Sequence, residues 1–305
     1  MTSDRFARGA SILFVFTLVV VTAASIISCG SGGEANSRIE VVVTIPPQAE
    51  FMHKVGGERV DVTIMVPSGT SPHTYAPKPS QLVDISRAEM YAKVGSGIDF
   101  ELAWMDKITA QNKDMLIVDC SEGIILQENI GDLNHGDEDG AHGELDPHIW
   151  VSPLNAMIMV RNIYDGLVQV DPDNRAYYGD NMNAYLRELE DLDNYISDSF
   201  AEATDRIFMV YHPTLGYFAQ EYDLTMLSIE EDGKEPTAAG LADLIDQAQE
   251  HGIKVIFASP QFSLRSAETV AAEIGGRVAL FDSLSEDYIA NLRTFSSELS
   301  LALVT

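Results

Sequence analysis

Cysteine is nearly absent from this sequence, with only Cys29 and Cys120 among 305 residues. So few cysteines exclude the framework of several disulfide bonds that stabilises many small secreted domains. Cys120 closes a short apolar run, 115–119, where a free cysteine is most simply a small buried hydrophobic residue. The protein must therefore be held together by ordinary hydrophobic cores.

Positive charge is also scarce. The chain has 19 Lys and Arg against 47 Asp and Glu, a net charge of -28. Nucleic acid is excluded as a partner, because its phosphates would be repelled over the whole surface. An acidic exterior suits solubility or the attraction of cations, and the charge alone does not separate these two.

Long apolar runs are absent except at the start. The run 12–27 follows Arg5 and Arg8, as in a secretory signal, and ends just before Cys29. The ending resembles a prokaryotic lipoprotein signal, whose Cys is lipidated and becomes the mature N-terminus. We predict a signal peptide over 1–28, lipidation of Cys29 and a flexible Gly-Ser tether over 29–37. An uncleaved anchor helix is the alternative, although about 16 residues is at the short limit for spanning a bilayer.

Beyond the tether, short β-rich runs alternate with helical patterns, which is typical of parallel sheets covered by helices. A chain of this length can bury two cores. The predicted fold class is α/β, with two lobes at 38–173 and 204–305, each a four-stranded, mostly parallel sheet flanked by helices. The runs form two sets of four: 39–45, 60–66, 90–94 and 116–119, then 207–211, 224–228, 254–258 and 277–281.

The stretch 174–203 between the two sets has no Gly or Pro after Gly179. Its apolar residues recur at spacings of three and four, the pattern of one helical face. We predict a single long helix here that joins the lobes. The apolar residues are Met182, Tyr185, Leu186, Leu189, Leu192, Ile196 and Phe200.

Three of the seven histidines lie in contexts unlike the others. His73 follows the run 60–66 in a loop that contains three prolines, and His212 follows the run 207–211. His148 lies just before a predicted helix start. Open α/β sheets form their ligand crevices at the carboxyl ends of strands. Taken singly, each histidine is more simply a packed or surface residue.

An acid accompanies these histidines, because Asp282 directly follows the run 277–281. Three neutral imidazoles and one carboxylate suit four-coordinate Zn²⁺, whereas Mn²⁺ favours more oxygen ligands. The alternative for Asp282 is a strand-end residue that caps a turn through Ser283 and Ser285. The predicted ligands of one Zn²⁺ are His73, His148, His212 and Asp282.

Six segments, in order, carry a resemblance to a known family. They are IPPQ at 45–48 with VGG at 55–57, PHTYAPKPS at 72–80, DPHIW at 146–150, HPTLGYF at 212–218, GKEPT at 233–237 and FDSL at 281–284. The chain resembles the zinc-binding members of the metal-specific (ZnuA/TroA-like) substrate-binding proteins of ABC importers, over nearly all of its mature length.

The resemblance implies two lobes with a connecting helix, and an extracytoplasmic protein that captures Zn²⁺ as transported ligand and delivers it to a membrane permease and, indirectly, its ATPase. It implies the same four ligands. His212 favours zinc, because manganese-binding relatives usually have a carboxylate at this position. We expect a monomer, attached to the membrane by lipid.

Two features depart from the family pattern. Pro72 stands where some zinc-binding relatives have an acid that can substitute as a ligand, so Asp282 or a water must serve. The loop before the second ligand is short, 128–146, and holds His135 and His142 among seven acids with no Lys or Arg. We predict weak accessory zinc binding there, with a solvated loop as the alternative. The last two histidines, His53 and His251, are expected to be structural or exposed.

Catalysis is the first rival function, because three histidines and a water on zinc also form a catalytic arrangement. The sequence has no HExxH motif, nucleophile elbow or Gly-rich phosphate loop, and Asp282 is expected in the fourth position. We therefore predict that the protein is not an enzyme. The other rivals are a manganese- or iron-binding homologue and a surface adhesin lipoprotein, which would bind a host ligand without metal.

Overall fold

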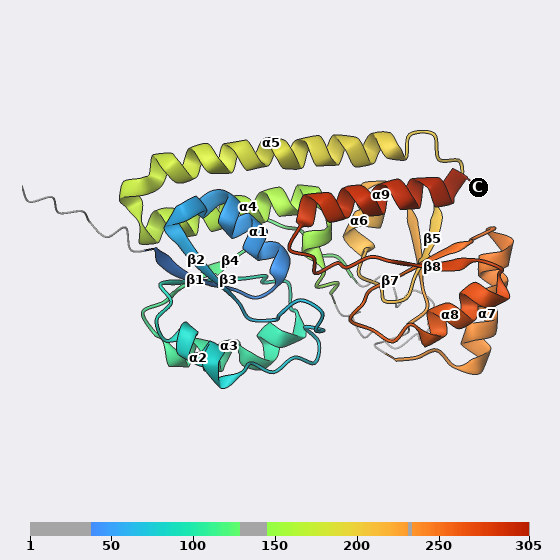
Figure 1. The fold of residues 1–305 in the computed structure, drawn as a ribbon, viewed down its shortest axis with the longest axis horizontal. Coiled ribbons are helices and arrows are strands. Elements are labelled where there is room, and N and C mark those ends of the chain that lie inside the picture. The colour runs from blue at the N-terminus through green and yellow to red at the C-terminus, as the bar shows by residue number, and fades with distance from the viewer. Residues whose placement is uncertain (1–37, 129–144, 231–233, 305) are drawn as a thin grey trace, which may run out of the picture. The chain divides into compact units, whose positions relative to one another are not determined.

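The structure is a computed structural model that describes residues 38–128, 145–230 and 234–304. These residues form two four-stranded sheets, with the strand orders β2-β1-β3-β4 and β6-β5-β7-β8 (Figure 1), and each described pairing between these strands is parallel. The predicted α/β class with two four-stranded sheets is confirmed. The strands are β1 (Ile39–Val43), β2 (Val60–Ile64), β3 (Met90–Lys93), β4 (Leu116–Asp119), β5 (Ile207–Val210), β6 (Thr225–Ser228), β7 (Val255–Ala258) and β8 (Arg277–Leu280).

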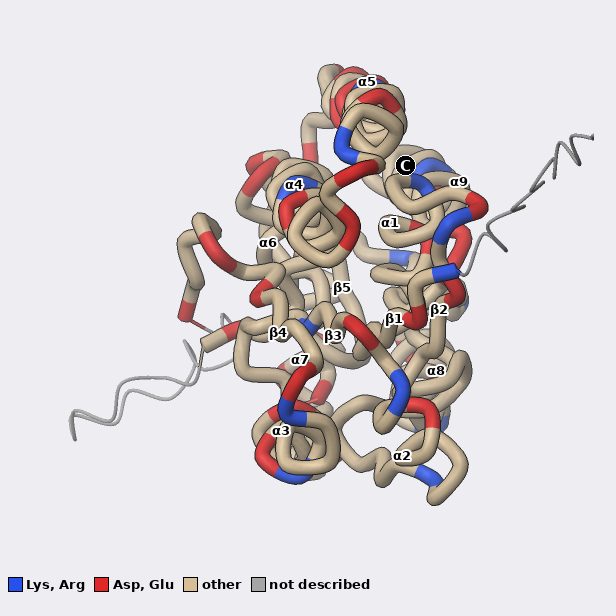
Figure 2. The backbone as a smooth tube through the Cα atoms, turned by 90° about the vertical axis from the view of Figure 1, so that its left-hand side faces the viewer, with Lys and Arg blue, Asp and Glu red and all other residues tan. Residues whose placement is uncertain are grey.

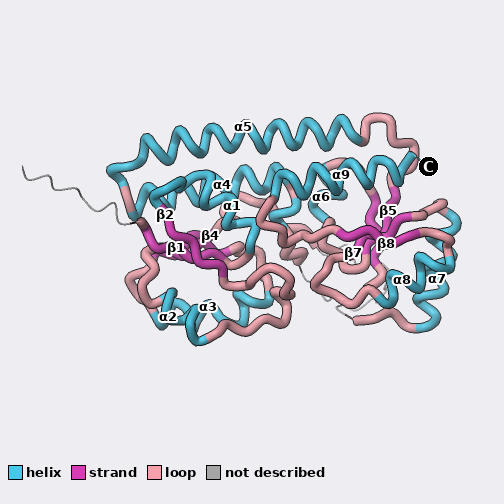
Figure 3. The backbone as a smooth tube through the Cα atoms, viewed as in Figure 1, coloured by secondary structure: helices cyan, strands magenta, loops and turns pink. Residues whose placement is uncertain are grey.

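Helices flank both sheets, as the alternation of patterns predicts (Figure 3). We call the first sheet with its helices the first lobe, and the second sheet with its helices the second lobe. The first lobe holds α1 (Pro46–Gly56), α2 (Pro79–Ile85), α3 (Asp99–Gln111) and α4 (Pro153–Val170), and the second holds α6 (Gly216–Glu221), α7 (Ala238–Glu250), α8 (Arg265–Glu273) and α9 (Tyr288–Val304). None of the helices within the described ranges combines the length and the apolar content needed to cross a bilayer.

Two helix starts follow from side-chain caps. The Ser152 hydroxyl accepts a hydrogen bond from the Asn155 backbone N–H at 3.1 Å, and the Thr237 hydroxyl accepts one from the Gly240 N–H at 3.0 Å. Each satisfies a backbone donor that has no partner inside the helix. The cap at Ser152 fixes the start of α4, and with it the short segment that carries His148.

The long helix α5 (Arg175–Ser199) packs on α1 and α4 of the first lobe and on α9 of the second (Figure 1). Its buried face includes Tyr185, Leu189 and Ile196, at the spacing that predicted it. The helix ends at Ser199, earlier than the predicted 203. The Arg206 guanidinium donates to the Phe200 carbonyl at 3.1 Å, which stabilises this C-terminus, and no Gly or Pro marks the stop.

One apolar core extends through both lobes. It joins residues of β1, β3, α1, α4 and α5 to residues of β5, β7 and α9, while two smaller clusters lie under α2 and α3 and under α7 and α8. Separating the lobes would expose part of this shared core to water, which is unfavourable. The site between the lobes is therefore supported by a continuous interior.

Acidic residues are spread over helices and loops of the described chain (Figure 2). They do not gather on one element. This distribution favours a solvated acidic exterior over a dedicated acidic binding face.

Candidate metal centre

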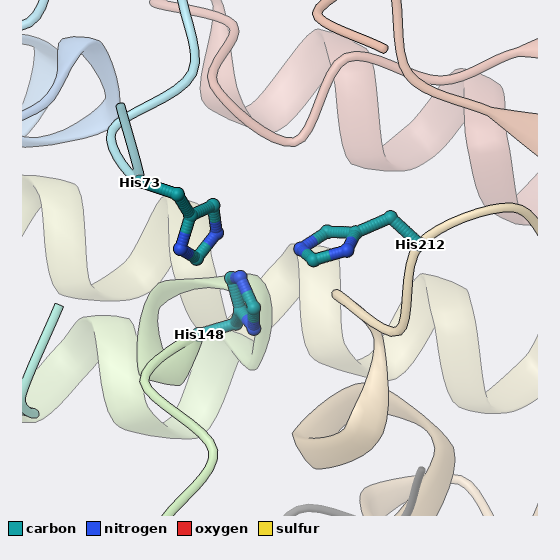
Figure 4. A group of neighbouring side chains, drawn as sticks. All are labelled: His73, His148 and His212. Carbon is teal, nitrogen blue, oxygen red and sulfur yellow. The ribbon is translucent and has the colours of Figure 1, made fainter. Parts of the chain in front are cut away.

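Three histidines from three separate loops meet at one place. His73 lies between β2 and α2, His148 directly precedes the 3₁₀ turn Ile149–Val151, and His212 lies just after β5. One ring nitrogen of each lies within 4.8 Å of the others, and the ring centroids are 5.2–5.7 Å apart. Figure 4 shows the rings facing a common point, with His212 opposite His73 and His148. Imidazoles at such distances can share one metal ion.

Asp282 is not part of this group. Its Oδ1 atom accepts hydrogen bonds from the Gln261 side-chain amide at 2.6 Å and from the Leu284 backbone N–H at 2.9 Å. Its carbonyl accepts the Ser285 N–H at 3.1 Å. Asp282 thus caps a turn at the end of β8, which is the alternative that its sequence context leaves open.

Other predicted site residues lie elsewhere. Cys29, His135 and His142 are outside the described residues. His53 is exposed on α1, and His251 lies at the C-terminal end of α7. The structure therefore groups three of the four predicted ligands of the main site.

Each of the three histidines has a carboxylate on the ring nitrogen Nδ1. The partner is Asp99 for His73 at 2.6 Å, Asp146 for His148 at 2.8 Å and Glu230 for His212. An ionised carboxylate only accepts hydrogen bonds, so each Nδ1 carries the proton and each Nε2 keeps a free lone pair. Carboxylates in this position orient metal-binding histidines and raise their basicity.

These supporting acids were missed in the sequence. Asp146 precedes His148 within the DPHIW segment, which was an available signal. Asp99 is the first residue of α3, and Glu230 follows β6, so their contacts with His73 and His212 depend on tertiary structure. Glu230 is one of several residues at the carboxyl end of a strand, where ligand sites form, and this position alone does not identify it as the partner of His212.

Burial shapes the electrostatics of His212. Burial lowers its pKa, the nearby His148 ring lowers it further, and the Glu230 carboxylate acts in the opposite direction. His212 is therefore neutral at pH 7. Its Nε2 atom is buried and has no hydrogen-bond partner among the described residues. This buried lone pair accepts no hydrogen bond, and a metal cation could bind it.

The rings enclose a cavity of about 10 Å³, which has room for one small ion or one water. Phe262 covers one side, with its ring 4.4 Å from the His212 ring. Trp150 covers another, and its indole N–H donates to the Ser283 carbonyl at 2.8 Å, which links the two lobes at the site. The size of the cavity suits a single ion.

A two-lobed α/β fold with three converging imidazoles between its lobes defines a metal-ion-binding protein. The family model of the periplasmic zinc-uptake complex component A, ZnuA, matches residues 41–302. The high-affinity zinc uptake system protein ZnuA of Bacillus subtilis is 30% identical over 282 residues, covering 90% of this chain and 88% of its own.

Solved structures agree with this match. A crystal structure of ZnuA has a TM-score of 0.82 and 39% identity, covering 88% of this chain and 100% of that chain. A zinc-bound deletion mutant of ZnuA has a TM-score of 0.81 and 38% identity, covering 88% and 98%. This chain belongs to the ZnuA family.

Proposed function

We infer that this protein is the substrate-binding component of a zinc ABC importer. It captures Zn²⁺ between its two lobes through His73, His148 and His212, and it delivers the ion to a membrane permease that an ATPase drives. The observation that carries this inference is the convergence of three imidazoles, each held by a carboxylate on Nδ1. With Nδ1 bound to a carboxylate in each ring, the three Nε2 atoms are the ones that can bind a metal ion.

Zinc is the favoured cargo, because the three nitrogen ligands are borderline-soft and Mn²⁺ prefers oxygen. Asp282, the predicted fourth ligand, is not among the residues whose ligand atoms lie within 4.8 Å of one another, and its Oδ1 atom accepts hydrogen bonds from Gln261 and Leu284. Capture is favoured over catalysis, because the matching family model is that of a zinc-uptake component and the cavity of about 10 Å³ suits a single ion. A metal-independent adhesin role gains no support from this site.

The proposed segments of the chain fit a protein that delivers zinc at a membrane. Residues 1–28 are the signal peptide, Cys29 is lipidated and 29–37 form a tether. The lobes extend over 38–173 and 204–305, and 174–203 join them. The protein acts outside the cytoplasm as a lipid-anchored monomer, and His135 and His142 bind zinc weakly in addition to the main site.

Competition between metals tests the function. The purified protein should bind one equivalent of Zn²⁺ tightly, and a large excess of Mn²⁺ or Fe²⁺ should not displace it, because three imidazoles favour zinc. A titration against a zinc-sensitive dye, with metal content measured after dialysis, provides the reading. Displacement by equimolar Mn²⁺, or no tight zinc equivalent, would contradict the proposal.

Replacing Cys29 with serine should move the protein from the membrane fraction to the soluble fraction, because the serine hydroxyl cannot receive the lipid. Cys120→Ser is the matched control, since Cys120 is buried beside β4 and should leave the fractionation unchanged. Immunoblots of the two fractions give the result. The anchor is refuted if the Cys29 variant, with its signal peptide shown to be removed, still sediments with membranes.

A further inference from the structure

Gln261 is a polar residue in the lining of the metal cavity. It follows β7 in the second lobe and lines the same 10 Å³ cavity as the three histidines. Its amide nitrogen Nε2 donates to Asp282 Oδ1 at 2.6 Å. Its oxygen Oε1 is buried and has no hydrogen-bond partner among the described residues.

The orientation of this amide is fixed by its partner. An ionised carboxylate has no hydrogen to donate, so the amide atom that faces Asp282 must be the NH₂ group. Turning the amide over would place two oxygen atoms 2.6 Å apart. Asp282 also accepts the Leu284 N–H at 2.9 Å, which holds its carboxylate in place. Asp282 therefore sets which way the oxygen of Gln261 points.

The unpartnered oxygen needs an explanation, because burying a carbonyl away from both water and any donor is unfavourable. The three histidines do not supply a donor, since their protons are on Nδ1 and engaged by Asp99, Asp146 and Glu230. The cavity is thus lined by three histidines, whose Nε2 lone pairs are free, and by Gln261, whose oxygen has no donor. A cation coordinated by all four residues would satisfy these atoms at once.

We propose that Oε1 of Gln261 is the fourth protein ligand of the captured ion, and that Asp282 is the positioning residue that orients it. This inference rests on the proposed zinc site. In this arrangement Asp282 does not contact the ion but orients the residue that does. Its hydrogen bonds to Gln261 and Leu284 support this role. The site then offers three imidazoles and one neutral oxygen, so its inner ligands carry no charge.

Two matched variants test this assignment. Gln261→Met keeps the length of the side chain but removes both polar atoms, and Asp282→Asn keeps an oxygen that accepts from the Gln261 amide. Zinc affinity is measured by dye competition, and Co²⁺ is substituted for zinc so that its visible absorption reports a change of ligand. We expect Gln261→Met to lower zinc affinity about 10–100-fold and to alter the Co²⁺ spectrum. Asp282→Asn should change the affinity less than about 5-fold and keep the spectrum, because an oxygen ligand is still oriented.

The results separate the possibilities. A large loss of affinity with a changed spectrum in Asp282→Asn would overturn the proposal, since Asp282 would then bind the ion directly. An unchanged spectrum in Gln261→Met would overturn it too, since a water would then fill the fourth position. Gln261→Asn, which is one methylene shorter, should repeat the loss if the methionine variant is unstable.

Failure of the proposed function looks different. If the wild-type protein binds no zinc, or if His73→Ala binds it as well as the wild type does, the zinc site itself is wrong. If both behave as expected and only Gln261→Met resembles the wild type, the zinc site stands and the role of Gln261 is refuted.

Discussion

Zinc affinity should fall about 100–1000-fold when His73 is replaced by alanine. Tight zinc sites bind with a free energy of about 10–16 kcal/mol, which is about 2.5–4 kcal/mol for each of four ligands. A loss of that size corresponds to two or three powers of ten. Dye-competition titration of the purified variant measures it directly.

His73 is the most informative of the three histidines to remove. Its carboxylate partner Asp99 has a side chain that is 58% exposed, so water replaces the lost contact. Asp146, behind His148, is 1% exposed, so removing that side chain would leave a buried carboxylate with only the backbone N–H of residue 148 as a donor. His73→Ala should therefore lose zinc affinity while keeping the stability of the metal-free protein.

His53→Ala is the matched control, since His53 is an exposed histidine of the same lobe. It should bind zinc like the wild type. Thermal unfolding with and without zinc adds a second reading, because a ligand that binds only the folded state raises its stability. Zinc should raise the Tm of the control and have little effect on His73→Ala. Equal zinc responses in the two variants would remove His73 from the ligand set.

Much of the fold could be predicted because its signals are local. Each of the eight β-rich runs became a strand, and the buried positions of α5 follow the spacing of three and four. The exact ends of the strands and helices were harder to predict. The run 39–45 gives a strand that stops at Val43, because Pro46 starts α1. Helix α5 stops where Arg206 reaches the Phe200 carbonyl, a contact that the local pattern does not specify.

The site could be predicted where its residues follow strands or carry motifs, and not where they act through tertiary contacts. His73 and His212 follow β2 and β5, and His148 stands in a recognisable segment. Asp99 and His73 are hydrogen-bonded although they are 26 residues apart in the sequence, and Gln261 and Asp282 are 21 residues apart. Both contacts exist only once the loops at the sheet edges are placed. Asp282 satisfied the strand-end rule, but that rule locates a residue without deciding what its side chain binds.

The stability of the interface between the lobes should depend on Glu221, the last residue of α6. Its carboxylate accepts a hydrogen bond from Ser152, the cap of α4 in the first lobe. Burial raises the pKa of Glu221 to about 7, and the nearby Asp193 carboxylate on α5 adds to the rise. Asp193 in turn accepts a hydrogen bond from the Tyr222 hydroxyl at 2.9 Å. Two partly buried acids thus lie close together where α6 meets α5 and the start of α4.

The sign of the pH effect follows from this shift. The pKa of Glu221 in the folded protein lies above the ordinary value of 4.5, so the folded state holds a proton that the unfolded state has lost. Its stabilising contribution is complete below about pH 4.5 and is lost as the pH rises through about 7. A shift from 4.5 to about 7 is worth about 3 kcal/mol at pH 8.

Glu221→Gln should therefore stabilise the protein at pH 8 by about 3 kcal/mol and have little effect near pH 4.5, because the glutamine is neutral throughout and can still accept a hydrogen bond from Ser152. Urea unfolding of the metal-free variant and wild type at pH 5, 6.5 and 8 measures the difference, and other titrating groups cancel in the comparison. Glu250→Gln, at an exposed position on α7, is the control and should stay within about 0.5 kcal/mol of the wild type at every pH. A Glu221→Gln difference that stays constant from pH 5 to pH 8 would show that this carboxyl is ionised throughout the range, and that the interface between the lobes tolerates the charge.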